Sequence, residues 1–363
     1  MSRDVHQLVL DYGRNATAYQ ILNAGFEHAW IGDAVVGYVR ARAWPGGPTV
    51  RVAAGVPIGP EAALAPAVAR FDALARSEGG WAIWFGVEPP ERPLFSGHAE
   101  LVVGSQPAWD PRQWDGLVAA HASVRSQIRR AGNKGVRVEE WAPAAASAHP
   151  GLHRCLHDWQ ASRGLSTLRF LTDPLVLHQL GDRRVFVAVQ PSDDGDRVVA
   201  YALLAPVPAR RGWLVEWIIQ GAGAPNGTPA RLLDAAMRAV AADGAAWATL
   251  GLAALSTRAP LSSTPPPVVI RALLAWTRAH ARRFYNFEGL ERFKAKFRPA
   301  AWEPVRLYAD QEALSLPTLY ALADAFSGAR SPVGVVTRAL AGAVRDEAAF
   351  AAHALRAGAS STP

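Results

Sequence analysis

The sequence predicts an α/β (α+β) protein built as two loosely similar halves, each a mixed sheet flanked by helices. Its 363 residues are too many for one small core and suit two domains. Helical and strand patterns alternate over residues 5–132, and the same kinds of pattern return in the same order after residue 150. The stretch WAPAAASAHP at residues 141–150 separates them. We therefore expect domains at residues 1–145 and 146–312, followed by a helical tail at residues 313–363.

The first half begins with a helical pattern and continues as GFEHAWIGDAVVGYVRARAW, which predicts paired strands around a Gly-Asp turn. TVRVAAGVPIG predicts a further strand, closed by a Gly-Pro turn. Residues 61–78 carry apolar side chains at helical spacing, among them Leu64, Val68 and Phe71. WAIWFGVEPP predicts another apolar strand, and residues 114–132 predict a basic helix.

In the second half, a helix at residues 151–163 precedes the strands RRVFVAVQ, DRVVAYALLAPVPA and GWLVEWIIQ, with an Asp-Gly hairpin signal between the first two. A Gly/Pro-rich loop leads into a helix at residues 229–243, the strand WATLGLAAL and a helix at residues 268–282. The tail is alanine-rich and helical, breaks at residues 327–332 and ends in a helix at residues 333–356. This last helix is either packed or solvated, or it contacts a membrane surface.

The composition limits the kinds of molecule that this protein is expected to bind and the compartment in which it is expected to work. A net charge of +7 and a pI near 10 favour an anion: nucleic acid, anionic lipid or a phosphorylated substrate. Only three of the 38 basic residues are lysines, so lysine is expected where a compact, mobile ammonium is needed. No run reaches the ~18 apolar residues of a spanning helix, and the N-terminus lacks a signal peptide, so we predict a cytoplasmic protein. The single Cys155 excludes an internal disulfide and a cysteine zinc cage.

Three segments are candidates for an anion site. The first, RRFYNFEGLERFKAKFRPAAWEP, interleaves basic and aromatic residues, and its FKAKF core fits a strand with Lys294 and Lys296 on one face. A solvated basic edge with its aromatics in the core is the alternative. The second, QGAGAPNGT, lies between a strand and a helix and predicts a backbone anion cradle, with a plain tight turn as the alternative. Pro225 makes this loop a poor match to a coenzyme A loop because it lacks an N–H.

The third candidate is the basic helix VRSQIRRAGNKGVRVEEW, which would attract a polyanion or form an ordinary exposed face. No nucleophile elbow, H-E-x-x-H pair or P-loop signature is present. His149, His153 and His157 are spaced by four residues without a matching set of acids, so no metal site is expected.

These segments together resemble a known family. YNFEGLERFKAKFRPAAWEP is similar to the signature near the end of the soluble domain of lysyl- and alanyl-phosphatidylglycerol synthases, the multiple peptide resistance factors. APNGT followed by a helix and TLGLAALS resembles the central block of that family, and SVRSQIRRAGNKGVRVEEW also matches in order. The resemblance spans residues 12–307 and does not include the membrane flippase half of full-length members.

The resemblance implies tandem N-acetyltransferase-like (GNAT) folds that move an aminoacyl group from aminoacyl-tRNA to a hydroxyl of phosphatidylglycerol, without metal or cofactor. It also implies a peripheral contact with the inner face of the cell membrane. No transmembrane segment is expected, because no apolar run is long enough. The expected residues fall into three groups. They are Glu216, Lys294 and Lys296 for catalysis; Gln220, Asn226, Gly227, Thr228, Tyr285, Asn286 and Arg298 for substrate binding; and Arg125, Arg129, Arg130 and Lys134 for tRNA.

The chain departs from the family pattern on the strand before the loop. The acid and arginine usual there fall on Trp217 and Gln220, with Glu216 adjacent. We expect Glu216 to act as an acid or base, because burial in an apolar strand would raise the pKa of its carboxyl group. The alternative is that Glu216 is the structural partner of a buried arginine. Two other functions stay open: an acyl-coenzyme A N-acyltransferase on the same fold, and a non-catalytic relative that binds anionic lipid or RNA.

Overall fold

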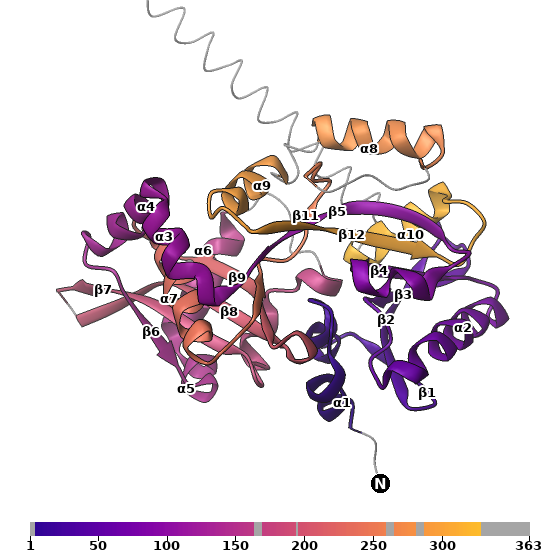
Figure 1. Cartoon of the computed structure of the whole chain (residues 1–363), viewed down its shortest axis with the longest axis horizontal. Coiled ribbons are helices and arrows are strands. Elements are labelled where there is room, and N and C mark those ends of the chain that lie inside the picture. Colours follow the sequence, from indigo (N-terminus) through magenta and orange to yellow (C-terminus); the bar gives the residue numbers. More distant parts are fainter. Residues whose placement is uncertain (1–3, 163–168, 194, 259–264, 281–286, 328–363) are drawn as a thin grey trace, which may run out of the picture.

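The computed structural model describes residues 4–162, 169–193, 195–258, 265–280 and 287–327. Its strands form one continuous sheet of twelve in the described chain, in the order β1-β2-β3-β4-β12-β5-β10-β9-β8-β7-β6, with β11 paired to β5 (Figure 1). The strands are β1 (Glu27–Ile31), β2 (Ala34–Arg42), β3 (Thr49–Ala54), β4 (Ala82–Val87), β5 (Ala99–Trp109), β6 (Arg137–Trp141), β7 (Arg184–Ser192), β8 (Gly195–Val207), β9 (Gly212–Gln220), β10 (Trp247–Thr249), β11 (Ala253–Ala254) and β12 (Ala301–Ala309).

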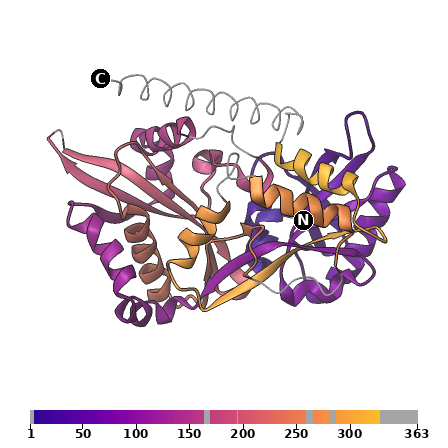
Figure 2. The same cartoon turned by 90° about the horizontal axis from the view of Figure 1, so that it is seen from above.

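Helices cover the sheet on both sides (Figure 1, Figure 2). The α-helices of the described chain are α1 (Val5–Tyr12), α2 (Glu61–Ser77), α3 (Trp114–Ala120), α4 (Ala122–Gly132), α5 (Pro143–Ala148), α6 (Pro150–Ala161), α7 (Thr228–Ala242), α8 (Val268–His280), α9 (Phe287–Ala295) and α10 (Leu316–Ser327). Helix α2 links the parallel strands β3 and β4, and α7 links the parallel strands β9 and β10, as parallel neighbours require.

The first half of the sheet includes a strand from late in the sequence. Strand β12 lies between β4 and β5 and pairs antiparallel with both, in register from Ala301↔Ala108 to Ala309↔Ala99 against β5. At the other edge β6 pairs with β7, far from β5, although β6 follows β5 in the sequence. Each half of the chain thus contributes a strand to the part of the sheet that the other half forms: β12 joins β4 and β5, and β6 joins β7. The domain boundary at residue 146 therefore stays a prediction.

The core is shared between the halves as well. One buried cluster joins Val9 and Val52 of the first half to Ala205 and Leu214 of the second. Another packs Trp114 and Val124 of α3 and α4 against α7 and strands β7–β9. The sheet junction, where β10 pairs with β5 at Ala248↔Trp109, belongs to the second of these clusters.

Most of the elements predicted from the sequence are confirmed, with three corrections. The single strand expected at WATLGLAAL is two short strands, β10 and β11, because the chain turns at Gly251 between them. The single helix expected over residues 114–132 is two helices, because His121 takes an extended backbone conformation between them. The strand expected at FKAKF is wrong: residues Phe287–Ala295 form the helix α9. Of the tail, α10 is described, and the expected helix at residues 333–356 lies outside the described residues. Within the described chain, no helix combines the length and apolarity needed to cross a bilayer.

A buried ion pair between Asp72 of α2 and His98 should make the free energy of unfolding depend on pH. His98 Nε2 lies 3.0 Å from Asp72 Oδ2, and Trp84 Nε1 donates to the other oxygen of Asp72 at 2.9 Å. Desolvation lowers the pKa of His98, but the hydrogen bond to Asp72 and the charges of Asp72 and Asp310 outweigh it, so the pKa is raised. The stabilisation is therefore complete below the unfolded-state pKa of about 6.5 and lost as the pH rises through the folded-state value.

Urea unfolding of the protein and of His98→Gln at several pH values tests this prediction. The difference in unfolding free energy between the two should be largest in mild acid and shrink as the pH rises. A constant difference across this range would mean that His98 contributes through its packing rather than through its charge.

Candidate functional site

The strands β9 and β10 part beside the sheet junction. They pair in parallel only from Trp247↔Gly212 to Thr249↔Leu214, after which β9 continues to Gln220. The chain beyond β10 turns at Gly251, whose φ of 69° suits glycine, and then pairs with β5 as β11. The hydroxyl of Thr249 accepts the N–H of Gly251 at 3.0 Å. The turn leaves the carbonyls of residues 251 and 252 outside the sheet ladder, where a side chain can bind them.

Lys294 binds this turn from helix α9. Its Nζ donates to the carbonyl oxygen of Gly251 at 2.8 Å and to that of Leu252 at 2.9 Å, and the residue is only 4% exposed. Burial lowers the pKa of Lys294 to about 7 because it disfavours the ammonium form. A neutral amine that donates twice keeps a lone pair, and an ammonium keeps a third N–H. Lys294 can therefore accept or donate a proton near neutral pH.

Aromatic packing fixes α9 in this position. Phe297 is buried and lies 6.4 Å from Trp114 between ring centroids, and Trp109 Nε1 donates to the Phe297 carbonyl at 2.9 Å. Phe293 packs on Phe297 with centroids 5.2 Å apart. Phe293 and Phe297 are four residues apart, so both lie on the buried side of the helix and its last turn.

The expected common face for the two lysines is not formed. Because the segment is helical, Lys294 points inward while Lys296 is exposed. Arg298, just beyond the helix, is also exposed and has a φ of 48°. The geometry separates one buried lysine from two surface cations. Tyr285 and Asn286, expected to contact substrate, lie outside the described residues.

Glu216 is half of a buried ion pair. Arg183 Nε donates to Glu216 Oε2 at 2.7 Å, and both side chains are 2% exposed. The other oxygen, Oε1, accepts from Gln20 at 3.0 Å, and Arg183 also donates to Asn23 at 2.6 Å and lies over the ring of Tyr19. Both carboxylate oxygens are thus occupied, which fits the structural alternative for Glu216. The sequence did not predict a role for Arg183. Its position directly before an apolar strand was the one local feature that indicated it.

The loop at residues 220–228 offers fewer free donors than its sequence suggests. The N–H groups of Gly221 and Ala224 donate to Val199 and Gly221 carbonyls, and that of Ala222 donates to the carboxylate of Asp158 at 3.0 Å. A carboxylate at this position would repel a second anion. The geometry therefore supports a tight turn more than an anion cradle.

The rest of the loop forms the start of α7. Thr228 is buried, and its hydroxyl donates to the Pro225 carbonyl at 2.6 Å. Gly227, with a φ of 98°, lies so close to α4 that a Cβ would come within 2.5 Å of the Gln127 carbonyl oxygen. Asn226 is exposed and Gln220 is partly buried at the end of β9. Of these expected substrate contacts, Asn226 is the most accessible.

Helix α4 and the turn that follows it carry three exposed cations and one that is engaged. Arg125 donates to the carbonyls of Val118 and Ala119 at the end of α3. Exposed side chains follow at Arg129, Arg130 and Lys134, which form no ion pair with another described residue. Helix α4 lies at the end of the molecule opposite α2 (Figure 1). Its buried face shares a core cluster with Phe293 and Phe297, so α4 and α9 are held by the same packing.

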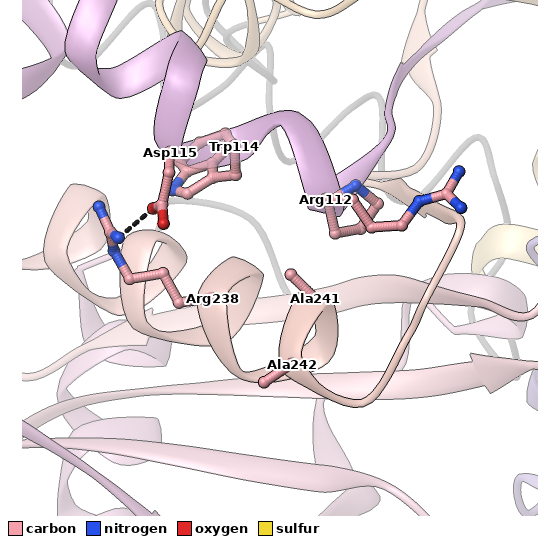
Figure 3. Close-up of a pocket in the computed structure, with 7 residues that line it drawn as sticks. Arg112, Trp114, Asp115, Arg238, Ala241 and Ala242 are labelled. Carbon is pink, nitrogen blue, oxygen red and sulfur yellow. Dashed lines mark hydrogen bonds and ion pairs between the residues drawn. The ribbon is translucent and has the colours of Figure 1, made fainter.

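A small surface pocket of about 250 Å³ lies between α3 and α7 (Figure 3). Its two arginines are already paired, Arg112 with Asp110 and Arg238 with Asp115 and Asp234. The seven residues that line it include none of the expected site residues. This pocket therefore does not carry the candidate chemistry.

Comparison with known proteins places this geometry in a family. The sequence model described as "Phosphatidylglycerol lysyltransferase, C-terminal" matches residues 6–308. Comparison with curated protein sequences gave no match. Among solved structures, the chain is similar to the C-terminal domain (DUF2156) of a protein named as a lysylphosphatidylglycerol synthetase from Agrobacterium fabrum. That pair has a TM-score of 0.73 and 22% identity, over 90% of this chain and 96% of that one.

A second similar structure is L-PGS from Bacillus licheniformis, with a TM-score of 0.71 and 19% identity over 90% of this chain and 96% of that one. FemX is more distant, with a TM-score of 0.52 and 11% identity over 89% of this chain and 99% of that one. The predicted fold class, α/β with mixed sheets flanked by helices, is confirmed. Because the family match covers most of its length, the chain belongs to the transferase family defined by the C-terminal domain of phosphatidylglycerol lysyltransferase.

Proposed function

We propose that this chain transfers an aminoacyl group from aminoacyl-tRNA to a hydroxyl of phosphatidylglycerol. Membership of the lysyltransferase family supports the reaction class. The observation that carries the proposal is Lys294, a buried amine with a pKa near 7, held against the turn where β9 and β10 part. A proton acceptor is what a glycerol hydroxyl needs in order to attack an ester.

In the proposed reaction one proton moves from the glycerol hydroxyl to the ribose oxygen, and Lys294 alone can carry it. The glycerol oxygen attacks the carbonyl carbon of the aminoacyl ester, and its proton passes to the neutral Nζ. The bond from that carbon to the ribose oxygen then breaks, and the ammonium returns the proton to the ribose oxygen. The donor ester is already activated, so positioning and proton transfer suffice. The proposal requires no metal or cofactor.

The surface cations would hold the two charged substrates. Lys296 and Arg298, exposed just beyond Lys294, would contact the lipid phosphate. Arg129 and Arg130 of α4, with Lys134 in the turn after it, would contact the tRNA backbone. Both substrates would meet at the inner face of the cell membrane, with this chain as a peripheral protein. The carboxylate of Asp158 on α6 counts against the coenzyme A alternative, because it accepts the N–H of Ala222, a loop donor that a pyrophosphate would need.

Transfer of a labelled amino acid from charged tRNA into vesicle lipid tests the proposal. We expect label in a lipid product with phosphatidylglycerol vesicles and none with phosphatidylcholine vesicles. A parallel incubation with labelled acetyl-coenzyme A and amine acceptors tests the alternative enzyme. If no charged tRNA supports transfer while vesicle or RNA binding persists, the chain is a binding protein rather than a transferase.

A further inference from the structure

Helix α8 lies on the outside of the molecule, on the same side of the sheet as α9 (Figure 1, Figure 2). Its inner side is anchored by Ile270, which is 2% exposed, and by Leu274, which packs on the core cluster that includes Val103 and Leu307. The helix is thus seated on the protein by two residues one turn apart.

The outer side of α8 is apolar too. Val268 is 69% exposed, Val269 60%, Trp276 52% and Leu273 38%. With 3.6 residues per turn, Val268 and Trp276 fall on the side opposite the one that Ile270 and Leu274 occupy. Val269 and Leu273 lie on the flank next to Trp276. A surface helix normally turns polar residues to water, and one that is apolar on both sides is usually covered. The outer side of α8 therefore has the character of a contact surface.

The charges of α8 indicate which partner covers it. Its sequence, VVIRALLAWTRAH, contains Arg271 and Arg278 and no acidic residue. Arg278 reaches back to the Leu255 carbonyl at 3.2 Å and to Thr257, so the arginines flank the apolar stripe on one side. Apolar residues with a tryptophan, flanked by arginines, form the composition of a helix that lies in the interface of an anionic membrane. Symmetric pairing with a second copy would instead bring arginines together without acids on the helix to neutralise them.

We propose that α8 docks the protein on the surface of an anionic bilayer, with Val268, Val269, Leu273 and Trp276 in the interface and Arg271 among the lipid headgroups. The inference rests on the proposed function in one respect, because it takes the acceptor lipid to be bound from a membrane. It adds the surface of contact. Since α8 and α9 lie on one side of the sheet, docking would turn the side of the molecule that carries α9 and the exposed Lys296 toward the lipid.

Vesicle co-sedimentation with the double variant Val269→Ser/Trp276→Ser tests the docking surface. Both positions are exposed, so the fold should survive, which circular dichroism and thermal unfolding check. We expect binding to phosphatidylglycerol vesicles to weaken roughly tenfold or more. The matched control is Trp44→Ser, which removes a tryptophan of similar exposure (47%) between β2 and β3 and should bind as the unmodified chain does.

Transfer assays separate this proposal from the proposed function. With vesicle lipid, the α8 double variant should lose transfer, whereas with short-chain phosphatidylglycerol dispersed below its micelle concentration it should keep it. Equal vesicle binding by both chains would overturn the docking proposal and leave the transferase proposal intact. The docking proposal would also be overturned if sedimentation without lipid showed a dimer that the α8 variant abolishes, since a second copy would then cover the helix.

Discussion

Replacing Lys294 with alanine should lower the rate of transfer by about 100-fold or more, the usual contribution of a positioned proton carrier. The reason is that Nζ combines burial, a fixed position against the turn at residues 251–252 and a pKa near 7. The rate of the unmodified protein should rise with pH through about 7, because the neutral amine that accepts the proton accumulates above its pKa. Single-turnover assays across this pH range, with saturating lipid, measure both effects.

Two neighbouring changes serve as controls for Lys294. Lys294→Arg keeps a cation that stays protonated, so it should not restore the rate. Lys296→Ala removes an exposed cation two residues away and should raise KM for the lipid while kcat changes little, since surface contacts hold the substrate equally before and during the reaction. Full activity in the Lys294→Ala/Lys296→Ala double variant would reduce this segment to a basic surface edge.

Glu216→Ala should cost about 3–5 kcal/mol of unfolding free energy, the usual effect of leaving one buried charge without its partner. Arg183, 2% exposed, would keep its hydrogen bond to Asn23 but lose its carboxylate. Because Asn23 and Gln20 come from the first half of the chain and Arg183 and Glu216 from the second, the loss would also loosen the contact between the halves. Urea or thermal unfolding measures the change.

The double variant Arg183→Met/Glu216→Leu distinguishes a structural pair from a catalytic acid. Removing both charges should recover much of the stability lost by Glu216→Ala, because no unpaired charge remains buried. For a structural role, the variant should also keep its transfer rate. Glu216 would be the acid or base after all if Glu216→Ala unfolded like the unmodified protein and yet lost kcat.

The sequence predicted the buried elements well because their patterns are local. The spacing of Leu64, Val68 and Phe71 predicts α2, and all three are buried. The segment around Lys294 was ambiguous because Phe293 and Phe297 fit two periods, alternation and a spacing of four residues. Packing against Trp109 and Trp114 decides between them in the folded protein, and neither tryptophan is near in the sequence.

The candidate site was predicted less completely, because its contacts join distant residues. Lys294 was expected from the sequence, but its carbonyl partners lie 42 and 43 residues away. Arg183 and Glu216 lie 33 residues apart on different elements. The carboxylate of Asp158 fills a loop donor from 64 residues away. No local pattern encodes such partners, because the fold alone brings them together.

The position of β12 has a consequence for how the protein is made. Until residues 301–309 have left the ribosome, β4 and β5 have no strand between them, so each presents an unpaired edge. The nascent chain must keep these edges from joining each other or another polypeptide while some 190 further residues are synthesised after β5. Products truncated before Ala301 should therefore aggregate, whereas a break after Ala309 would leave the sheet complete.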